Sequence, residues 1–191
     1  MHKTIKISEG DIVMNKDAVV IYKSEYGFTK KYAEWIAEKL NCNCMQADKY
    51  DFGMDYKTVI FGGGLYAGKI NGIKFLVKNY DKIKGKKIVV FTVGVADTKD
   101  LGNVKNILSS AKKQMSEEMF SKIIFFHFRG GMNYEKMSFI HQCMMWFMKT
   151  MLSKKPEQER TESDRAVIEN YGGKFDFSDK NTIDELVRYC L

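Results

Sequence analysis

Short apolar runs alternate with longer amphipathic segments along most of the chain. Each run is continuous, which is typical of strands that are buried on both faces of a sheet. The predicted strands cover residues 18–22, 44–47, 58–61, 88–93 and 123–128. Between the runs, apolar residues recur with the three- or four-residue spacing of helices. The predicted helices cover residues 28–40, 72–80, 101–119 and 179–189.

This alternation predicts a doubly wound, three-layer α/β fold in which helices cover both faces of a parallel sheet. The length of 191 residues suits one domain, and no Pro-rich, Gly/Ser-rich or repeated stretch divides it. We therefore expect an N-terminal extension at residues 1–16 and a single domain at residues 17–191. Because ligands of such sheets bind at the carboxyl ends of the strands, the loops that follow the strands are the candidate sites.

The loop after the first strand has the composition of a phosphate-binding turn. Its residues are Ser24, Glu25, Tyr26, Gly27, Phe28 and Thr29. A phosphate group needs backbone N–H donors at a helix N-terminus, hydroxyl donors, and a glycine where the chain turns sharply. Ser24 and Thr29 supply hydroxyls, and Gly27 supplies the turn. The alternative is that Ser24 or Thr29 only caps the helix.

The glycine-rich segment after the third strand is compatible with several kinds of site. As a Walker A motif it has Gly68-Lys69, but Ile70 stands where a magnesium-binding Ser or Thr is required. As a dinucleotide fingerprint it lacks the acidic residue at the end of the next strand, since Asp81 precedes that strand. As a flavin-binding loop, its glycines would let the backbone approach a flat ring, and Tyr66 would offer an aromatic face. An ordinary glycine-rich surface turn is the remaining alternative.

The first loop, together with the Val-Val-Ile-Tyr-Lys segment before it, resembles the flavodoxins. The resemblance implies a flavodoxin-like three-layer sandwich with a five-stranded parallel sheet of strand order 2-1-3-4-5. It also implies one FMN, with its phosphate in the first loop and its ring between the loops after the third and fourth strands. The cofactor-binding residues are then Ser24, Glu25, Tyr26, Gly27, Phe28, Thr29, Gly64, Leu65, Tyr66, Ala67, Gly68, Thr92, Val93 and Gly94. Asp97, just beyond them, contacts the flavin or is the N-cap of the next helix.

The segment after the fifth strand adds a strongly apolar helix. A loop is predicted at residues 129–131, with a helix from there to Ser153. In one interpretation the helix packs on the sheet through Met137, Ile140, Met144, Phe147 and Met151, while Trp146 covers a groove. In the other, Phe139, Cys143, Trp146 and nearby Met residues form an exposed apolar edge flanked by lysines. Such an edge at residues 135–152 would meet a quinone, a membrane surface or a partner protein.

This region is similar to the flavodoxin-type protoporphyrinogen oxidases, the menaquinone-dependent dehydrogenases of haem biosynthesis. The shared features are the Gly/Arg loop and the Met-rich helix, and the similarity covers nearly all of the chain from residue 17 onward. The chain departs from that family at residues 132–137, where Met-Asn-Tyr-Glu-Lys-Met replaces a helix entry rich in Arg and aromatic residues. The resemblance implies an FMN-dependent oxidoreductase that passes electrons to a quinone or to a redox partner protein.

Composition narrows the choice of partners more than the choice of folds. Lys and Arg number 31 against 24 for Asp and Glu, so the formal net charge is +7 and acidic partners are favoured. Nucleic acid is not expected, since no recognised binding module accompanies the scattered lysines. The four cysteines and three histidines form no zinc pattern, so we expect reduced thiols, no metal, and structural roles for His127 and His141. Residues 1–13 contain no run resembling a signal peptide, and the expected location is cytoplasmic, with peripheral contact at the inner membrane face.

Three functions follow from these patterns. The first is an FMN-dependent oxidoreductase, because FMN accepts one or two electrons without a catalytic acid or base from the protein. The net positive charge of this chain favours this function, because ordinary flavodoxins are acidic electron carriers that dock on basic partners. The second is an electron carrier with a specialised acidic partner, and the third is a flavin-free scaffold or regulatory module that has kept the fold.

Overall fold

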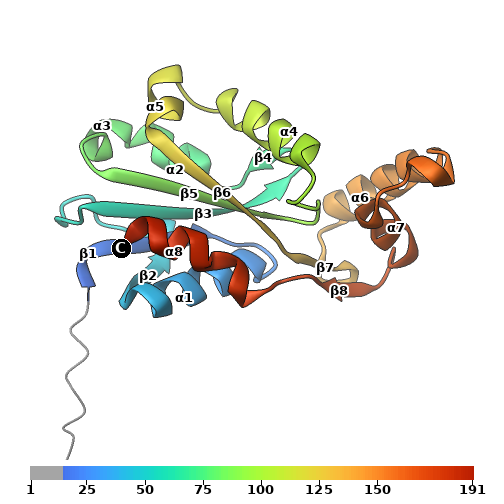
Figure 1. Ribbon diagram of the computed structural model, residues 1–191, viewed down its shortest axis with the longest axis horizontal. Helices are drawn as coiled ribbons and strands as arrows, with labels where there is room; N and C mark the ends of the chain where they lie inside the picture. Colours follow the sequence, from blue (N-terminus) through green and yellow to red (C-terminus); the bar gives the residue numbers. More distant parts are fainter. Residues whose placement is uncertain (1–14) are drawn as a thin grey trace, which may run out of the picture.

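The structure, a computed structural model, describes residues 15–191 and contains a parallel sheet between two layers of helices (Figure 1). The parallel strands are β1 (Asn15–Lys23), β2 (Cys42–Gln46), β3 (Thr58–Tyr66), β5 (Lys87–Gly94) and β6 (Ile123–Arg129). They pair in the order β2-β1-β3-β5-β6, while β4 (Lys69–Ile70) pairs antiparallel with β3. Apart from β4, this is the predicted order 2-1-3-4-5, so the flavodoxin-like fold is confirmed. Most of the predicted N-terminal extension, residues 1–14, lies outside the described residues.

Helices cover both faces of the sheet. One face carries α1 (Phe28–Leu40) and α8 (Asp184–Cys190), which follows the 3-10 helix η4 (Lys180–Ile183). The other face carries α2 (Ile73–Lys78), α3 (Tyr80–Ile83), α4 (Leu101–Lys112) and α5 (Glu117–Lys122). A further 3-10 helix, η1 (Ala47–Lys49), follows β2.

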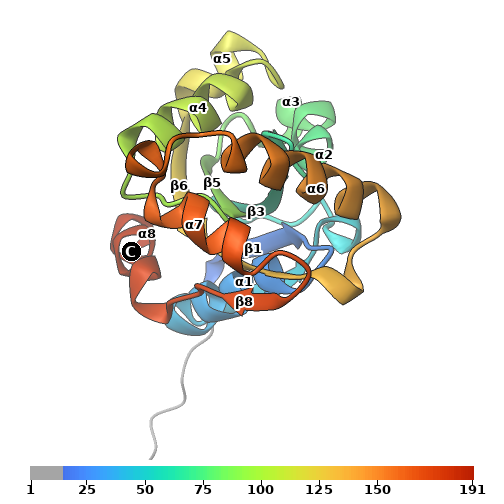
Figure 2. The same cartoon turned by 90° about the vertical axis from the view of Figure 1, so that its right-hand side faces the viewer.

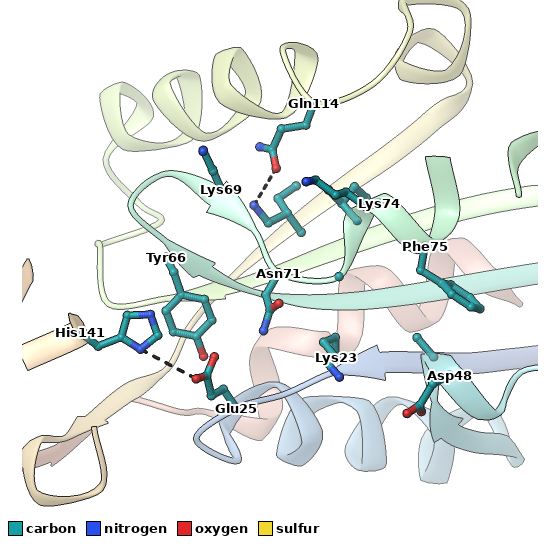
Figure 3. Close-up of a pocket in the computed structure, with 14 residues that line it drawn as sticks. Lys23, Glu25, Asp48, Tyr66, Lys69, Asn71, Lys74, Phe75, Gln114 and His141 are labelled. Carbon is teal, nitrogen blue, oxygen red and sulfur yellow. Dashed lines mark hydrogen bonds and ion pairs between the residues drawn. The ribbon is translucent and has the colours of Figure 1, made fainter. Parts of the chain in front are cut away.

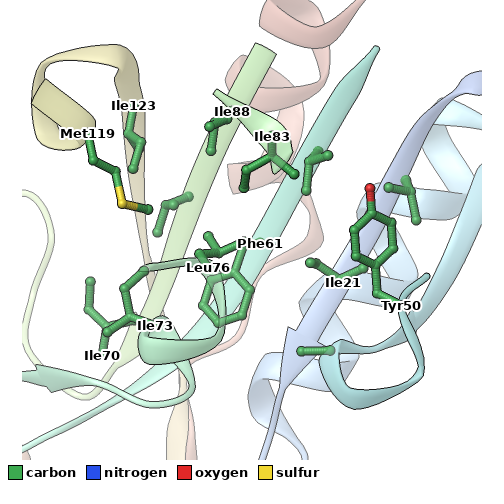
Figure 4. Packing of buried hydrophobic residues seen from close by; sticks show 14 of the residues in the cluster. Ile21, Tyr50, Phe61, Ile70, Ile73, Leu76, Ile83, Ile88, Met119 and Ile123 are labelled. Atoms are coloured by element: carbon green, nitrogen blue, oxygen red, sulfur yellow. The ribbon is translucent and has the colours of Figure 1, made fainter. Parts of the chain in front are cut away.

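Alternate strand residues supply the two cores, as the period of two in a β-strand requires. Val19, Ile21 and Phe61 point to the face of α2–α5, where Leu76 and Ile83 pack against them (Figure 4). The next residues along the strands point the other way and meet α1 and α8. This second core contains Val20, Ile60, Phe91, Tyr32 and Leu186.

A hairpin replaces the predicted loop after the third strand. β3 extends to Tyr66, so Gly62, Gly63 and Gly64 lie inside a buried strand. The chain then turns at Ala67 and Gly68, with φ angles of +48° and +75°, and returns as β4. A two-residue hairpin turn needs positive φ at both central residues to match the twist of its strands, and Ala67 and Gly68 meet this requirement.

The chain between β6 and α8 forms an excursion that the sequence prediction described only in part. It contains β7 (Gly131–Asn133), η2 (Tyr134–Lys136), α6 (Phe139–Ser153), η3 (Glu157–Glu159), α7 (Glu162–Glu169) and β8 (Lys174–Asp176). β7 and β8 pair antiparallel, and α6 and α7 pack together over Met132, Met145 and Val167. The excursion places α6 across the carboxyl end of the sheet (Figure 2).

Several predicted boundaries are wrong for identifiable local reasons. The predicted helix at 101–119 is two helices, because Ser116 caps α5 by accepting a hydrogen bond from Met119 N at 3.2 Å. The apolar helix begins at Phe139 after its N-cap Ser138, and residues 131–133 are strand β7 instead of helix or loop. The second strand begins at Cys42, two residues earlier than predicted.

Candidate functional site

The loop after β1 leaves the N-terminus of α1 without a side-chain cap from any described residue. Gly27 occupies the N-cap position with φ +92°, in the left-handed region that glycine tolerates best. The first turn of α1 holds no acidic residue and includes Lys30 and Lys31. Because the first N–H groups of a helix carry partial positive charge, this end of α1 is suited to hold an anion.

The two hydroxyls of this loop have different surroundings. Ser24 Oγ accepts a hydrogen bond from Gly27 N at 3.1 Å, so Ser24 closes the turn. Thr29 is only 2% exposed, and its hydroxyl makes no hydrogen bond within residues 15–191. Neither residue caps α1, so the simple capping alternative is wrong. The Thr29 hydroxyl and the first amides of α1 are available to a ligand.

An apolar cavity of about 800 Å³ lies beside this loop, at the carboxyl ends of β3 and β5. This volume falls within the range of about 300–1,000 Å³ that is common for small-molecule sites. Five elements contribute to its walls: the first loop, the β3–β4 hairpin, the segment after β5, α4, and α6. Of the predicted cofactor-binding residues, the cavity brings together Tyr26, Leu65, Tyr66, Ala67, Gly68 and Gly94.

The other predicted residues lie around this cavity instead of lining it. Phe28 packs against Gly130 and Gly131 at the start of the excursion. Thr92 and Val93 are buried in β5, at 0% and 5% exposure. Ser24, Gly27, Thr29 and Gly64 also stay outside the cavity walls, and Glu25 lines a neighbouring cavity.

The glycines of β3 serve the packing of the protein itself, contrary to the prediction that they let a flavin ring approach. A Cβ atom at Gly62 would lie 2.2 Å from the ring of Phe91. At Gly63 it would lie 2.5 Å from Ile70, and at Gly64 it would lie 2.9 Å from the ring of Tyr66. These positions are therefore filled by side chains that cross the strand, and Gly64 allows the Tyr66 ring to lie against it.

Tyr66 and Tyr26 form an aromatic corner in which a histidine of α6 takes part. The His141 ring stacks on Tyr66 with 4.9 Å between ring centroids and 14° between planes. Its Nδ1 is hydrogen-bonded to the Tyr26 hydroxyl and lies 4.0 Å from the Glu25 carboxylate. The Tyr26 hydroxyl also accepts a hydrogen bond from Ser138 N at 3.3 Å. These contacts hold the N-terminal end of α6 against the first loop.

Sequence reasoning assigned His141 a structural role and did not place it at the site. No local pattern identifies it, because its position depends on the excursion folding back over the sheet. The cavity also contains unpredicted residues from the segment after β5 and from α4: Val95, Ala96, Asn103, Asn106 and Ile107. Asp97, a candidate N-cap, does not cap α4, since Asp100 accepts the hydrogen bond from Gly102 N.

A second cavity of about 520 Å³ adjoins the first, with Tyr66 and His141 in the walls of both (Figure 3). Unlike the first cavity, it has charged side chains in its walls next to apolar ones such as Ile70 and Phe75. Three lysines line it, Lys23, Lys69 and Lys74, together with the carboxylates of Glu25 and Asp48. The excess of one positive charge makes this cavity suited to an anionic group.

The apolar helix α6 is exposed on one side and does not pack on the sheet as the first interpretation proposed. Ile140, Phe147 and Met151, predicted to pack there, are 70%, 61% and 52% exposed. Phe139 and Trp146 are also exposed, and Met145 alone in α6 is buried. The structure therefore agrees with an exposed apolar edge. No helix among residues 15–191 is long and apolar enough to cross a membrane.

Burial keeps Tyr66 and His127, near the site, and Cys42, at the start of β2, in their neutral forms. Burial, with Glu25 and Tyr26 nearby, raises the pKa of Tyr66, so its ring remains a neutral phenol. His127 lies behind the site, where its Nδ1 is 2.7 Å from Thr92 Oγ1, and burial lowers its pKa to about 4. His127 therefore joins two strands as a neutral side chain. Burial also raises the pKa of the free Cys42 thiol to about 12, which disfavours a thiolate.

These features fit FMN as a ligand. A phosphate matches the uncapped N-terminus of α1 with its free Thr29 hydroxyl, and a flat ring matches the apolar cavity that contains Tyr66. Tyr26 lines the cavity and directly precedes Gly27, so one turn of the chain lies beside both the phosphate site and the ring site.

The fold has counterparts among solved structures. A flavodoxin from the domain Archaea is 11% identical, with a TM-score of 0.39, and the match covers 80% of this chain and 94% of that one. The Trp repressor binding protein of Bacillus subtilis is 14% identical, with a TM-score of 0.39 and coverages of 59% and 84%. A flavodiiron protein of Giardia intestinalis is 14% identical, with a TM-score of 0.37 and coverages of 60% and 32%. Because these identities and TM-scores are low, the assignment of the fold rests on the strand order and not on these structures.

Sequence comparisons give a clearer result for the family than for individual relatives. A search of curated proteins found no match to the chain. The family model described as a flavodoxin domain matches residues 19–159, well over half of the 191 residues. The matched range begins in β1 and extends through α6, so it includes the first loop, the hairpin and the segment after β5. The chain therefore belongs to the flavodoxin domain family.

Proposed function

We propose that this protein binds FMN and transfers electrons through it. The observation that carries the proposal is the adjacency of two complementary sites: an uncapped helix N-terminus for the phosphate and an apolar cavity for the ring. The flavin supplies the redox chemistry, since it accepts one or two electrons. The chain supplies binding and orientation.

The residues of the site divide these tasks. The first amides of α1 and the Thr29 hydroxyl hold the phosphate, while the neighbouring Lys30 and Lys31 are paired with Glu34 and Asp176. Tyr66 offers a neutral aromatic surface. α6 lines the cavity with methionine and phenylalanine side chains, which favours the interaction of apolar molecules with the ring.

Purified protein is expected to take up one FMN per chain, and Tyr66→Ala is expected to weaken that binding about tenfold. An aromatic contact contributes about 0.5–1.5 kcal/mol beyond the burial of its area, and 1.4 kcal/mol is a factor of ten. Tyr189→Ala serves as the matched control, since Tyr189 lies on α8 outside both cavities. Visible absorption during FMN titration measures both. A colourless protein that takes up no FMN would favour the flavin-free scaffold.

A more specific function is an oxidoreductase, similar to protoporphyrinogen oxidase, that passes electrons from a small anionic reductant to a quinone. The apolar wall of α6 beside the cavity supports a quinone acceptor. The adjoining cavity with Lys23, Lys69 and Lys74 supports a reductant that carries carboxylates. The net charge of +7 also distinguishes this chain from acidic carriers.

Supplying protoporphyrinogen and a menaquinone analogue together separates this enzyme from a simple carrier. We expect turnover that needs both compounds and that falls at least about threefold in Lys69→Glu/Lys74→Glu, because two like charges then face the carboxylates. Lys78→Glu/Lys82→Glu, with both residues outside the cavity, is the control for net charge. Reduction of the flavin by a protein partner alone, without turnover of the small molecules, would instead assign the carrier function.

A further inference from the structure

The exposed side of α6 is an apolar strip. Its members recur three or four residues apart and therefore share one face of the helix. They are Phe139, Ile140, Cys143, Trp146, Phe147 and Met151. Thr150, the polar residue among them, donates its hydroxyl to Trp146 O at 2.8 Å. The strip thus presents neither a charge nor an unsatisfied polar group to solvent.

The polar residues of α6 point elsewhere. His141 and Gln142 are half-buried, and the side-chain amide of Gln142 donates to the Met137 carbonyl oxygen at 3.1 Å. Lys149 Nζ lies 4.6 Å from the centre of the Tyr171 ring in the excursion. The inward side of α6 is also apolar, with Met145, Met148 and Leu152 packed in the excursion. A surface helix in water normally has only one apolar side, so the second, exposed one indicates a surface that meets another apolar phase.

A lysine stands at each end of the strip, and at the N-terminal end it follows the exposed Glu135. Lys136 precedes α6 and Lys154 follows it, and both are exposed. α6 itself contains no Asp or Glu. With 15 residues it is about 22 Å long, shorter than the roughly 30 Å hydrocarbon core of a bilayer, so it cannot span one. Apolar side chains between lysines are instead typical of helices that lie in the interface of an anionic membrane.

We propose that α6 docks the protein on the surface of an anionic lipid bilayer, with Phe139, Trp146 and Phe147 inserted among the lipids. A protein partner fits less well, because specific interfaces carry about one hydrogen bond per 100–200 Å² and this strip offers no free polar group. Trp is also favoured at the membrane–water boundary. Phe139, Ile140 and Phe147 line the apolar cavity as well, so the cavity opens on the side that faces the lipid.

The full chain is expected to sediment with vesicles of phosphatidylcholine and phosphatidylglycerol at low salt, and far less with phosphatidylcholine alone. Trp146→Ser/Phe147→Ser is expected to lower the partition coefficient at least about tenfold, because two exposed apolar side chains no longer leave water. Met54→Ser/Leu191→Ser is the matched control. Both residues are exposed, at 46% and 84%, and Leu191 lies at the C-terminus, at the end of the molecule away from α6 (Figure 1).

Further measurements test the membrane contact separately from the folding of the variants and from flavin binding. Trp35→Phe leaves Trp146 as the one tryptophan, and its emission is expected to shift to the blue on anionic vesicles. Lys136→Glu/Lys154→Glu is expected to weaken binding to anionic vesicles without removing an apolar group. Sedimentation is compared with and without added FMN, so a protein that binds no flavin still tests the surface.

Three outcomes would overturn the proposal. One is the absence of sedimentation with anionic vesicles at low salt. Another is equal sedimentation of wild type and Trp146→Ser/Phe147→Ser, with circular dichroism showing both folded. The third is a dimer in solution that this double variant dissociates while vesicles bind neither protein, since the strip would then belong to a contact between two copies.

Discussion

Ser24→Ala/Thr29→Val is expected to weaken FMN binding about 100-fold or more. Hydrogen bonds to a charged group contribute about 1.5–3 kcal/mol each, and 1.4 kcal/mol is a factor of ten. Thr29 is 2% exposed and makes no hydrogen bond within residues 15–191, so valine replaces it with little loss of packing. Ser24 Oγ also accepts from Gly27 N, so its removal loosens the turn that presents the α1 amides. Titration with FMN, followed by visible absorption, measures the change.

Riboflavin, which has the ring of FMN without its phosphate, distinguishes loss of the phosphate site from general damage. Its affinity is expected to change less than threefold in the double variant, because the ring cavity keeps all of its walls. Ser121→Ala/Thr182→Val is the control, since both hydroxyls lie on exposed helix ends away from the loop. Equal affinity for FMN before and after the substitutions would remove residues 24–29 from the phosphate site.

The layered fold could be predicted because its information is local. Residues 88–93 form a continuous apolar run, which predicts a buried strand, and the apolar residues within 28–40 recur with helical spacing. The type of each element and the order of elements along the chain therefore followed from the sequence pattern. The limits of helices were less predictable. Residues 113–116 interrupt a continuous helical pattern because the Ser116 hydroxyl competes as a cap.

The excursion could not be predicted because it depends on contacts between distant residues. β7 and β8 have three residues each, pair across about 40 positions of sequence, and carry no alternating pattern of their own. Their pairing places α6 over the sheet end and brings His141 to Tyr66 and Tyr26. The Met-rich helix was visible in the sequence, but which of its faces is exposed depends on this folding.

The glycine-rich segment illustrates how one pattern served a different purpose from the one expected. Close approach to a flavin and close approach to a neighbouring ring both require the absence of a Cβ atom, so sequence alone does not separate them. In the structure, Phe91 and Tyr66 occupy the space above Gly62 and Gly64. The hairpin beyond them, at Ala67 and Gly68, lines the cavity. The glycine-rich segment therefore contributes to the site through the hairpin turn that follows it and not through its own glycines.

Gly62→Ala is expected to destabilise the protein by about 2–3 kcal/mol, because inserting a methyl group into a packed core commonly costs about 1–3 kcal/mol. The new Cβ would lie 2.2 Å from Phe91 Cζ and 2.7 Å from both Cε atoms. Phe91 is 0% exposed and packs on Phe128 with 5.8 Å between ring centroids, so its ring has no free space to enter. At about 2–4 °C per kcal/mol for a chain of this size, the melting temperature falls by roughly 5–10 °C.

Gly85→Ala is the matched control for the same chemical change. Gly85 lies in the turn before β5 and does not adopt positive φ, and a Cβ atom at this position would have no other atom within 4 Å. Its replacement is expected to leave stability within about 0.5 kcal/mol of wild type. Thermal unfolding of the FMN-free proteins isolates packing from ligand binding. If Gly62→Ala unfolds at the same temperature as Gly85→Ala but binds FMN far more weakly, then Gly62 is reserved for the flavin, and its role in packing against Phe91 is wrong.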